Sequence, residues 1–519
     1  MRVGDILSRA ACRWPERPSW IQDGKIISFA EAETRVNRLA NGLIDLGMAK
    51  GQRLGLLVNN CYEGLETILA PMKVGMSVVP INARLHEKEI QYLLENSDAR
   101  GLVYGHEFRS QVDSMRSSLT KLEHFICIGE GGARSIDYES LLSRSSEYKP
   151  DVSIDPGDLA WVFYTSGTTG RPKGAMLSHR NILSMTQGFL TDINPARLGD
   201  VLLHASPITH GSGLSMFHHI GRGAANAFPG TRRFDPALIF QAIERYEVTT
   251  MFMAPTMINM LVASGLHGKY DLSSLHTIVY GGGPMYVEHL LEAMETFGNI
   301  FVQLYGQGEA PMAITSLPKE EHFLSNDPDR LRRLGSAGRE VTGVRVAILD
   351  EEDRELEVGV TGEICVRSDL VMSGYLNNPL ATSETLRNGW LHTGDLGYLD
   401  EKAYLFVTDR KNDMIISGGA NIYPREVEEV IARHPAVADV SVFGVPDAVW
   451  GESVKAALVL SHGVQVTEED IIEFCRVNMA SYKKPKSVDF HETLPKNAYG
   501  KVEKNELRKQ YWTEKERNI

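Results

Sequence analysis

A loop rich in glycine and hydroxyl side chains is the part of the sequence best suited to chemistry. Residues 164–174 read YTSGTTGRPKG and follow the apolar stretch LAWVF. Glycines let backbone N–H groups turn toward an anion and the hydroxyls add donors, so the loop suits a polyphosphate. It lacks the GxxxxGK[ST] spacing of a Walker A loop, and the following AMLS is typical of a strand rather than a helix. The alternative interpretation is a polar surface turn.

Five further motifs follow this loop along the chain. They are YGQGE (Tyr305–Glu309), GWLHTGD (Gly389–Asp395), DR (Asp409–Arg410), SGGANIYPREVE (Ser417–Glu428) and LPKNAYGK (Leu494–Lys501). With the loop, they resemble the signature motifs of the adenylate-forming superfamily, which contains acyl-CoA synthetases, adenylation domains of peptide synthetases and luciferases. The resemblance covers essentially the whole chain. Each motif alone is a modest signal, but six in the right order make coincidence a poor explanation.

The resemblance implies a two-step reaction. A carboxylate attacks the α-phosphate of ATP to give an acyl adenylate and pyrophosphate, and a thiol then displaces AMP. Because the first step joins two anions, the site must neutralise charge on the phosphorus. The resemblance makes Lys501 the catalytic lysine and Glu309 a ligand of Mg²⁺, a cation that prefers carboxylate and phosphate oxygens. Taken alone, each side chain could equally be a solvated surface charge.

The resemblance also assigns the nucleotide contacts. Asp395 would accept the ribose hydroxyls and Arg410 would donate to the ribose, while Tyr305 would form the adenine and acyl-pocket wall with a glycine turn. That turn is Gly281, Gly282 and Gly283. The phosphate contacts would come from Thr165, Ser166, Gly167, Thr168, Thr169, Gly170 and Lys173. His210, in SPITHGSG, resembles the gate at the mouth of the acyl site, and its alternative is a core histidine.

Coenzyme A is the acceptor that the resemblance implies. Trp450, Lys484 and Lys486 fall where CoA-using relatives bind the CoA nucleotide, and a ring with basic neighbours suits that task. Gly418 and Gly419 match a glycine loop beside the pantetheine path. A basic loop of this size is otherwise a solvated turn.

Two positions depart from the family pattern. Gly308 stands where the family has a threonine before the glutamate, so one hydroxyl contact must come from another donor. Asn412 stands at the hinge position, where relatives often carry Asp or Lys. Asparagine still tolerates the unusual backbone conformations that a pivot must visit.

Composition limits the classes of function. The chain has 519 residues and a formal net charge of −13, which argues against a general nucleic-acid binder. The five cysteines are far apart without a CxxC pair, so neither a zinc cluster nor a disulfide framework is predicted. We find no signal peptide and no run of about 18 apolar residues, so we expect a cytoplasmic protein without a membrane span. The oligomeric state stays open, a homodimer included.

The predicted fold class is α/β with two domains. Short β-branched runs alternate with helical patterns over most of the chain, which predicts stacked, mostly parallel βα sheets. After about residue 316 closely spaced strands predict a small barrel-like unit, and beyond Asn412 the pattern predicts a compact α+β domain. We therefore expect a large AMP-binding domain over residues 1–411 and a small, mobile domain with the catalytic lysine over residues 412–519.

The predicted acyl-pocket segments carry no charged side chain. They are His210–Phe217, Met253–Met257 and Tyr280–Gly283. Together with the resemblance, this favours an ATP-dependent acid–CoA ligase acting on an apolar monocarboxylate, whether medium-chain fatty, alicyclic or aryl. The alternatives are an enzyme that loads a carrier-protein phosphopantetheine, a Rossmann oxidoreductase and a non-catalytic nucleotide-binding module. The oxidoreductase would need a GxGxxG motif that residues 211–213 do not provide.

Overall fold

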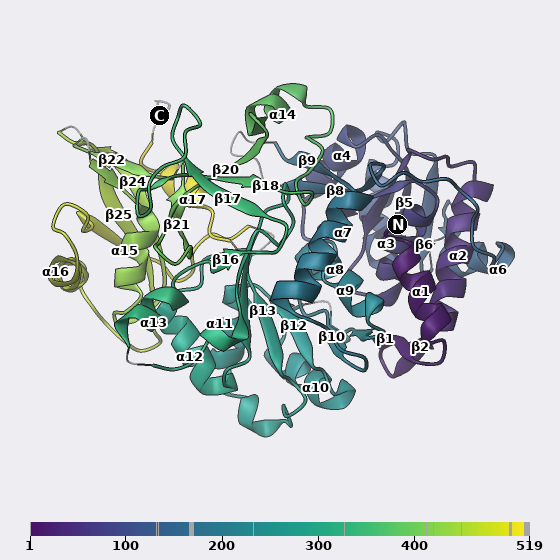
Figure 1. Cartoon of the computed structure of the whole chain (residues 1–519), viewed down its shortest axis with the longest axis horizontal. Helices are drawn as coiled ribbons and strands as arrows, with labels where there is room; N and C mark the ends of the chain where they lie inside the picture. Colours follow the sequence, from purple (N-terminus) through teal and green to yellow (C-terminus); the bar gives the residue numbers. More distant parts are fainter. Residues whose placement is uncertain are drawn as a thin grey trace.

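The computed structural model describes residues 2–130, 132, 134–165, 171–231, 233–325, 327–411, 413–418, 420–447, 449–497 and 501–512. Within these residues the chain forms a large N-terminal α/β domain and a small C-terminal domain, as the sequence predicts. Figure 1 shows the small domain at the left and the first helices and strands at the right.

The first sheet of the large domain has nine strands within the described residues. In order across the sheet they are β16 (Arg339–Glu340), β15 (Thr315–Leu317), β14 (Phe301–Tyr305), β13 (Thr277–Tyr280), β12 (Thr250–Met253), β10 (Val201–Leu203), β11 (Ala225–Ala227), β1 (Pro18–Gln22) and β2 (Lys25–Ser28). Strands β10, β12, β13 and β14 are parallel, so their carboxyl ends meet at one edge. Open α/β sheets bind ligands at such an edge.

The second sheet has seven strands in the part of the chain described. Their order is β7 (Ile136–Asp137), β6 (His124–Ile128), β5 (Ala99–Gly105), β3 (Arg53–Leu57), β4 (Ser77–Ile81), β8 (Leu159–Thr165) and β9 (Lys173–Ser178). β3, β4 and β5 are parallel, as the alternation of strand and helix patterns predicts. β8 and β9 are antiparallel, and Thr165 pairs with Lys173. The two flanks of the glycine-rich loop therefore lie side by side.

Helices pack around these two sheets (Figure 1). Those of the large domain are α1 (Asp5–Arg13), α2 (Phe29–Asp45), α3 (Tyr62–Lys73), α4 (Glu87–Asn96), α5 (Arg109–Met115), α6 (Tyr138–Arg144), α7 (His179–Gly188), α8 (Gly211–Leu214), α9 (Met216–Gly221), α10 (Pro236–Tyr246), α11 (Pro255–Ala263), α12 (Val287–Phe297), α13 (Pro328–Leu334) and α14 (Pro379–Thr385). The Ser28 hydroxyl accepts the Glu31 N–H and so caps the start of α2. Asp235 caps α10 in the same way.

The third sheet is the predicted barrel-like unit, and its strands are antiparallel. It consists of β17 (Arg345–Leu349), β18 (Gly362–Arg367), β19 (Leu386–Arg387), β20 (Trp390–Leu399) and β21 (Leu405–Arg410). β20 and β21 place Asp395 directly opposite Arg410. Two motifs that are separate in the sequence therefore meet on neighbouring strands.

The small domain is an α+β unit around a fourth sheet. Its strands are β22 (Ile415–Ser417), β23 (Ala420–Ile422), β24 (Val437–Asp447), β25 (Gly451–Leu460) and β26 (Ser487–Phe490). Its helices are α15 (Pro424–Ile431), α16 (Glu468–Asn478) and α17 (Lys504–Arg508). The apolar core of this domain, which includes Val427, Val442 and Ile471, also takes in Tyr286 from the large domain.

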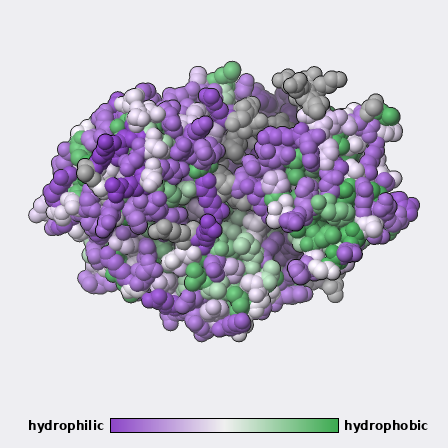
Figure 2. Space-filling model, turned by 180° about the vertical axis from the view of Figure 1, so that it is seen from behind, coloured by the Kyte–Doolittle hydropathy of each residue, from purple (hydrophilic) through white to green (hydrophobic). Residues whose placement is uncertain are grey.

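The surface is mostly polar. On the face turned away from the view of Figure 1, hydrophilic side chains cover most of the area (Figure 2). No helix within the described residues is both long enough and apolar enough to cross a membrane. All five cysteines are free thiols.

Candidate active site

Two glycine-containing turns lie together at the carboxyl edge of the first sheet. Gly281 follows β13 and Tyr305 ends β14, and these strands are neighbours. A Cβ atom on Gly281 would lie 2.5 Å from the Leu304 carbonyl oxygen, so only glycine fits where the two strand ends approach. Gly282 has a φ of +79°, which turns the chain away from the sheet. The structure thus brings the predicted glycine turn and Tyr305 together.

The Asp395 carboxylate is buried and lies at the centre of a polar cluster. The Tyr305 hydroxyl donates to Asp395 Oδ2 at 2.6 Å, and Gln307 Nε2 donates to the same oxygen at 2.7 Å. Arg410 Nε lies 3.7 Å from Oδ1. Burial and the Asp395 charge raise the pKa of the Tyr305 phenol, so the hydroxyl remains a donor. Sequence reasoning missed Gln307, although it occupies the variable position of the YGQGE motif.

Glu309 is a buried carboxylate that accepts two hydroxyl donors. Thr165 Oγ1 donates to Glu309 Oε1 at 3.0 Å, and the Tyr375 hydroxyl donates to the same oxygen at 2.7 Å. Lys173 Nζ lies 5.3 Å from the centre of the Tyr375 ring. Both bonds use Oε1, so Oε2 can face a cation. Tyr375 was not predicted, since SGYLNNP carries no motif that the sequence analysis identified.

Side-chain packing explains why position 308 is a glycine. A Cβ atom there would overlap Thr165 Cγ2 and lie 2.7 Å from Phe163 Cδ1. The methyl group of Thr165 therefore fills the space that a side chain at 308 would need. The hydroxyl of the same threonine donates to Glu309.

Lys501 of the small domain faces the residues just described. Its backbone N–H donates to Asn497 Oδ1 at 3.1 Å, and the Asn497 N–H donates to the Lys501 carbonyl at 2.8 Å. The side chain reaches solvent, yet desolvation by the surrounding protein and repulsion from Arg410 lower the pKa of its ammonium to about 8. Asp395 and Glu309 act in the opposite direction. The Lys501 ammonium therefore interacts electrostatically with both carboxylates.

His210 packs against Phe163, the residue that also borders Gly308. Its ring centre is 4.8 Å from that of Phe163, and a Cβ atom on Gly308 would contact both Phe163 and Thr165. Burial, with a smaller effect from the Lys501 charge, lowers the pKa of the imidazole to about 3. His210 is therefore neutral at physiological pH.

Three of the predicted CoA residues, Gly418, Trp450 and Lys486, lie together on the small domain. Gly418 has a φ of +60° and donates its N–H to the Trp450 carbonyl at 2.8 Å, and a Cβ atom on it would lie 2.5 Å from the Trp450 ring. Lys486 Nζ lies 5.2 Å from the centre of that ring and 3.1 Å from Asp447. Lys484 instead lies near α16, where its charge affects the pKa of Cys475.

Some predicted residues lie outside the described part of the chain. They are Ser166, Gly167, Thr168, Thr169, Gly170, Asn412 and Gly419. Their assigned roles stay predictions. The described flanks of the loop, Thr165 and Lys173, both lie beside the Glu309–Tyr375 pair.

Known proteins are similar to this chain along almost its whole length. A family model described as AMP-binding enzyme matches residues 7–376, and one described as AMP-binding enzyme C-terminal domain matches residues 426–501. The feruloyl-CoA synthase of Amycolatopsis sp. is 34% identical, over 98% of this chain and 99% of that protein. The fatty acid–[acyl-carrier-protein] ligase ScoC of Streptomyces coeruleorubidus is 31% identical, over 97% of this chain and 95% of that protein.

Solved structures agree with the sequence matches. The ATP-bound MatB from Rhodopseudomonas palustris superimposes with a TM-score of 0.88 at 29% identity, covering 98% of this chain and 99% of that one. The matched family models together span most of the sequence and both domains. The chain therefore belongs to the AMP-binding superfamily of adenylate-forming enzymes, and it is an enzyme of the AMP-forming acyl-CoA ligase family.

Proposed function

We propose that the protein is a carboxylic acid–CoA ligase that activates an apolar monocarboxylate as its acyl adenylate and transfers the acyl group to coenzyme A. The observation that carries the proposal is the electrostatic interaction of Lys501 with Glu309, Asp395 and Arg410. A cation from the small domain thus interacts electrostatically with the groups that would bind a nucleotide on the large domain. We propose residues 1–411 and 412–519 as these two domains.

Each residue has a distinct task in the first step. Asp395, oriented by Tyr305 and Gln307, would accept hydrogen bonds from the ribose hydroxyls. Lys501 would lie over the α-phosphate and stabilise the charge that builds up when the carboxylate oxygen attacks and pyrophosphate leaves. Its pKa of about 8 leaves most of the ammonium protonated at neutral pH, and the phosphate charge favours the protonated form further.

The donor set at Glu309 fits a magnesium ion. A single carboxylate with one oxygen outside the hydroxyl contacts suits Mg²⁺, which is commonly held by one or two carboxylates together with substrate phosphates and water. When bound there, the ion would neutralise phosphate charge. Thr165 and Tyr375 would hold Glu309 in place for it.

The surroundings of the gate support a neutral, apolar acid. A Cβ atom on Gly211 would lie 2.9 Å from the Phe252 ring and 3.6 Å from Met312 Cε, so the segment after His210 packs on an aromatic ring and a thioether. His210 itself is uncharged. An unpaired second carboxylate or an ammonium group would be costly to bury there. We therefore favour medium-chain fatty, alicyclic or aryl acids.

The acceptor is the second part of the proposal. Trp450, 51% exposed, offers a ring for stacking, and Lys486 beside it offers a cation for a phosphate. These groups suit the nucleotide of CoA. The similarity to a fatty acid–[acyl-carrier-protein] ligase keeps a carrier-protein phosphopantetheine as the second candidate.

The test is pyrophosphate release from ATP over a panel of acids, followed by product analysis with CoA or with a phosphopantetheinylated carrier protein. We expect release with butyrate-to-decanoate chains or ring acids, and thioester formation with CoA. Preference for an amino acid or a dicarboxylate would overturn the proposed acid class. Thioester formation on the carrier protein but not on CoA would establish the second candidate.

A further inference from the structure

A bulge in β20 carries Asp395 into the site. β20 pairs with β18, but their register shifts between Glu363 and Cys365. Residues 393–395 of β20 therefore lie opposite Ile364 alone, which makes an extended β-bulge. Asp395 is the last residue of this bulge. The backbone position of Asp395 therefore depends on the geometry of the bulge.

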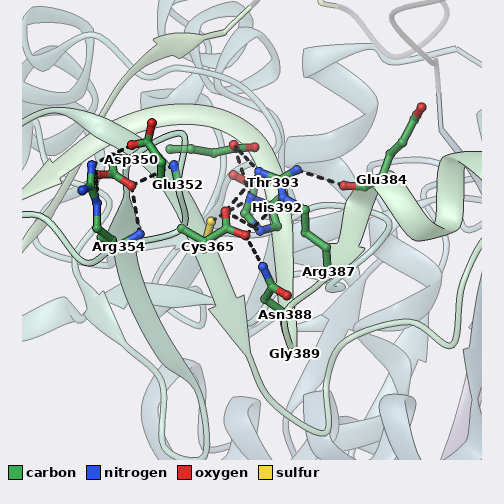
Figure 3. Close-up of polar contacts among 12 residues, drawn as sticks. Asp350, Glu352, Arg354, Cys365, Glu384, Arg387, Asn388, Gly389, His392 and Thr393 are labelled. Carbon is green, nitrogen blue, oxygen red and sulfur yellow. Dashed lines mark hydrogen bonds and ion pairs between the residues drawn. The ribbon is translucent and has the colours of Figure 1, made fainter.

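Glu363, behind the bulge, holds its middle residue. The Gly394 N–H donates to Glu363 Oε1 at 3.1 Å, and Gly394 has a φ of +72°, in the left-handed region. Glu363 Oε2 lies 3.3 Å from His392 Nδ1 and 3.8 Å from Arg387 Nη2. Figure 3 shows dashed polar contacts around His392 and Thr393, with Arg387, Asn388 and Cys365 nearby. One carboxylate therefore contacts both the centre of the bulge and His392, the residue that precedes it.

Thr393 fastens the bulge to β18 a second time. Its hydroxyl donates to the Ile364 carbonyl at 2.6 Å and accepts the Asp395 N–H at 3.1 Å. The backbone on each side of Gly394 is therefore held from β18. Glu363 is 12% exposed through its side chain, so water competes little for its hydrogen bonds.

Asp353 is a second carboxylate in the same cluster and provides a matched comparison. It accepts from Asn388 Nδ2 at 2.6 Å and from Arg387, and it lies 3.5 Å from His392 Nε2. Its hydrogen bonds go to side chains, whereas Glu363 also accepts a backbone N–H of the bulge. Removing Asp353 disturbs the charge cluster but leaves the bond to Gly394 in place.

We propose that Glu363 is a positioning residue for nucleotide binding. By accepting the Gly394 N–H it fixes the bulge, and the bulge directs the Asp395 carboxylate toward the ribose hydroxyls. Glu363 itself does not touch the nucleotide. The inference rests on the proposed function, in which Asp395 binds the ribose.

The experiment compares ATP with 2′,3′-dideoxy-ATP in single-turnover pyrophosphate release. The wild type should prefer ATP, because only ATP offers the hydroxyls that Asp395 accepts. Glu363→Ala should lower kcat/KM for ATP about tenfold, mainly through KM, and leave the dideoxy reaction nearly unchanged. Glu363→Gln retains an acceptor oxygen for Gly394 and should keep most of the preference. Asp353→Ala should behave like the wild type.

A wrong ribose contact for Asp395 and a wrong role for Glu363 would give different results. If the wild type uses both nucleotides equally, the ribose contact of Asp395 is wrong, and the inference falls with it. If the wild type discriminates but Glu363→Ala still does, or lowers both reactions by the same factor, Glu363 is not a positioning residue. Loss of the preference in Glu363→Gln would contradict the hydrogen bond to Gly394. Should Glu363→Ala not fold, Thr393→Val, which releases the Asp395 N–H, must lose the preference instead.

Discussion

At the scale of single residues, the contact between positions 165 and 308 explains an unusual glycine. We expect Gly308→Ala to destabilise the protein by about 1–3 kcal/mol, because the new methyl group would overlap Thr165 Cγ2 and crowd Phe163. Thr165→Ser removes the obstructing methyl group but keeps the hydroxyl that binds Glu309. The double variant should therefore recover part of the loss. Thermal unfolding of the three variants measures this, and a neutral Gly308→Ala would show that the space is not occupied.

The protonation of Lys501 sets a pH limit on adenylate formation. A lysine is useful at the α-phosphate only as a cation, so the rate should fall as pH rises through the pKa of about 8. The decline with pH should appear in kcat/KM, which reports the pKa values of groups in the free enzyme. Single-turnover pyrophosphate release at several pH values measures it. Lys501→Arg stays protonated throughout, so its residual rate should lack this decline. The same decline in both proteins would assign it to another group.

At the scale of elements, the start of α12 joins the two domains. The Tyr286 hydroxyl lies 3.3 Å from Glu428 Oε2 and 3.4 Å from the Val440 carbonyl, and the Val287 N–H binds Glu429. Two consecutive glutamates of α15 thus contact two consecutive residues of the large domain. These contacts stabilise the pose in which Lys501 faces Glu309 and Asp395.

We therefore expect Tyr286→Phe to shift the domains away from this pose. Losing one hydrogen bond of about 1 kcal/mol should slow adenylate formation about fivefold. Acyl-CoA formation from supplied acyl adenylate should not slow. Tyr148→Phe, at a tyrosine 80% exposed, is the control. Equal slowing of both half-reactions would mean that Tyr286 contributes only to folding.

At the scale of the whole molecule, the periodicity of the sequence predicted the βα sheets, the barrel-like unit and the α+β domain in this order along the chain. It could do so because the alternation of strand and helix patterns is visible in short stretches of sequence. The motifs predicted the cluster of Tyr305, Glu309 and Asp395. Gln307 and Tyr375 escaped prediction, because their partners lie 88 and 66 residues away and only folding brings them together. The overlap of Thr165 with Gly308 is likewise invisible before the chain is folded.

Motion of the small domain is a prediction that still rests on the sequence at Asn412. Lys501 faces the site in this pose, and the CoA thiol must later reach the same acyl carbon. Asn412→Pro fixes φ near −65° and removes an N–H, so it should favour one pose. We expect adenylate formation to persist while steady-state acyl-CoA formation falls. Pyrophosphate release in a single turnover, measured beside steady-state product formation, tests this. If both rates fall together, or neither does, the pivot lies elsewhere.

The central claim is that the substrate carboxylate attacks the α-phosphate of ATP at the site around Lys501. An accepted acid labelled with oxygen-18 in its carboxylate, turned over with ATP and CoA, tests this most directly. Attack at the α-phosphate makes one carboxylate oxygen the bridge to phosphorus, and the thiol then breaks the bond from carbon to that oxygen. The account predicts AMP that carries one labelled oxygen and pyrophosphate without label, and loss of labelled AMP in Lys501→Ala. Unlabelled AMP, or ADP with labelled phosphate, would contradict it.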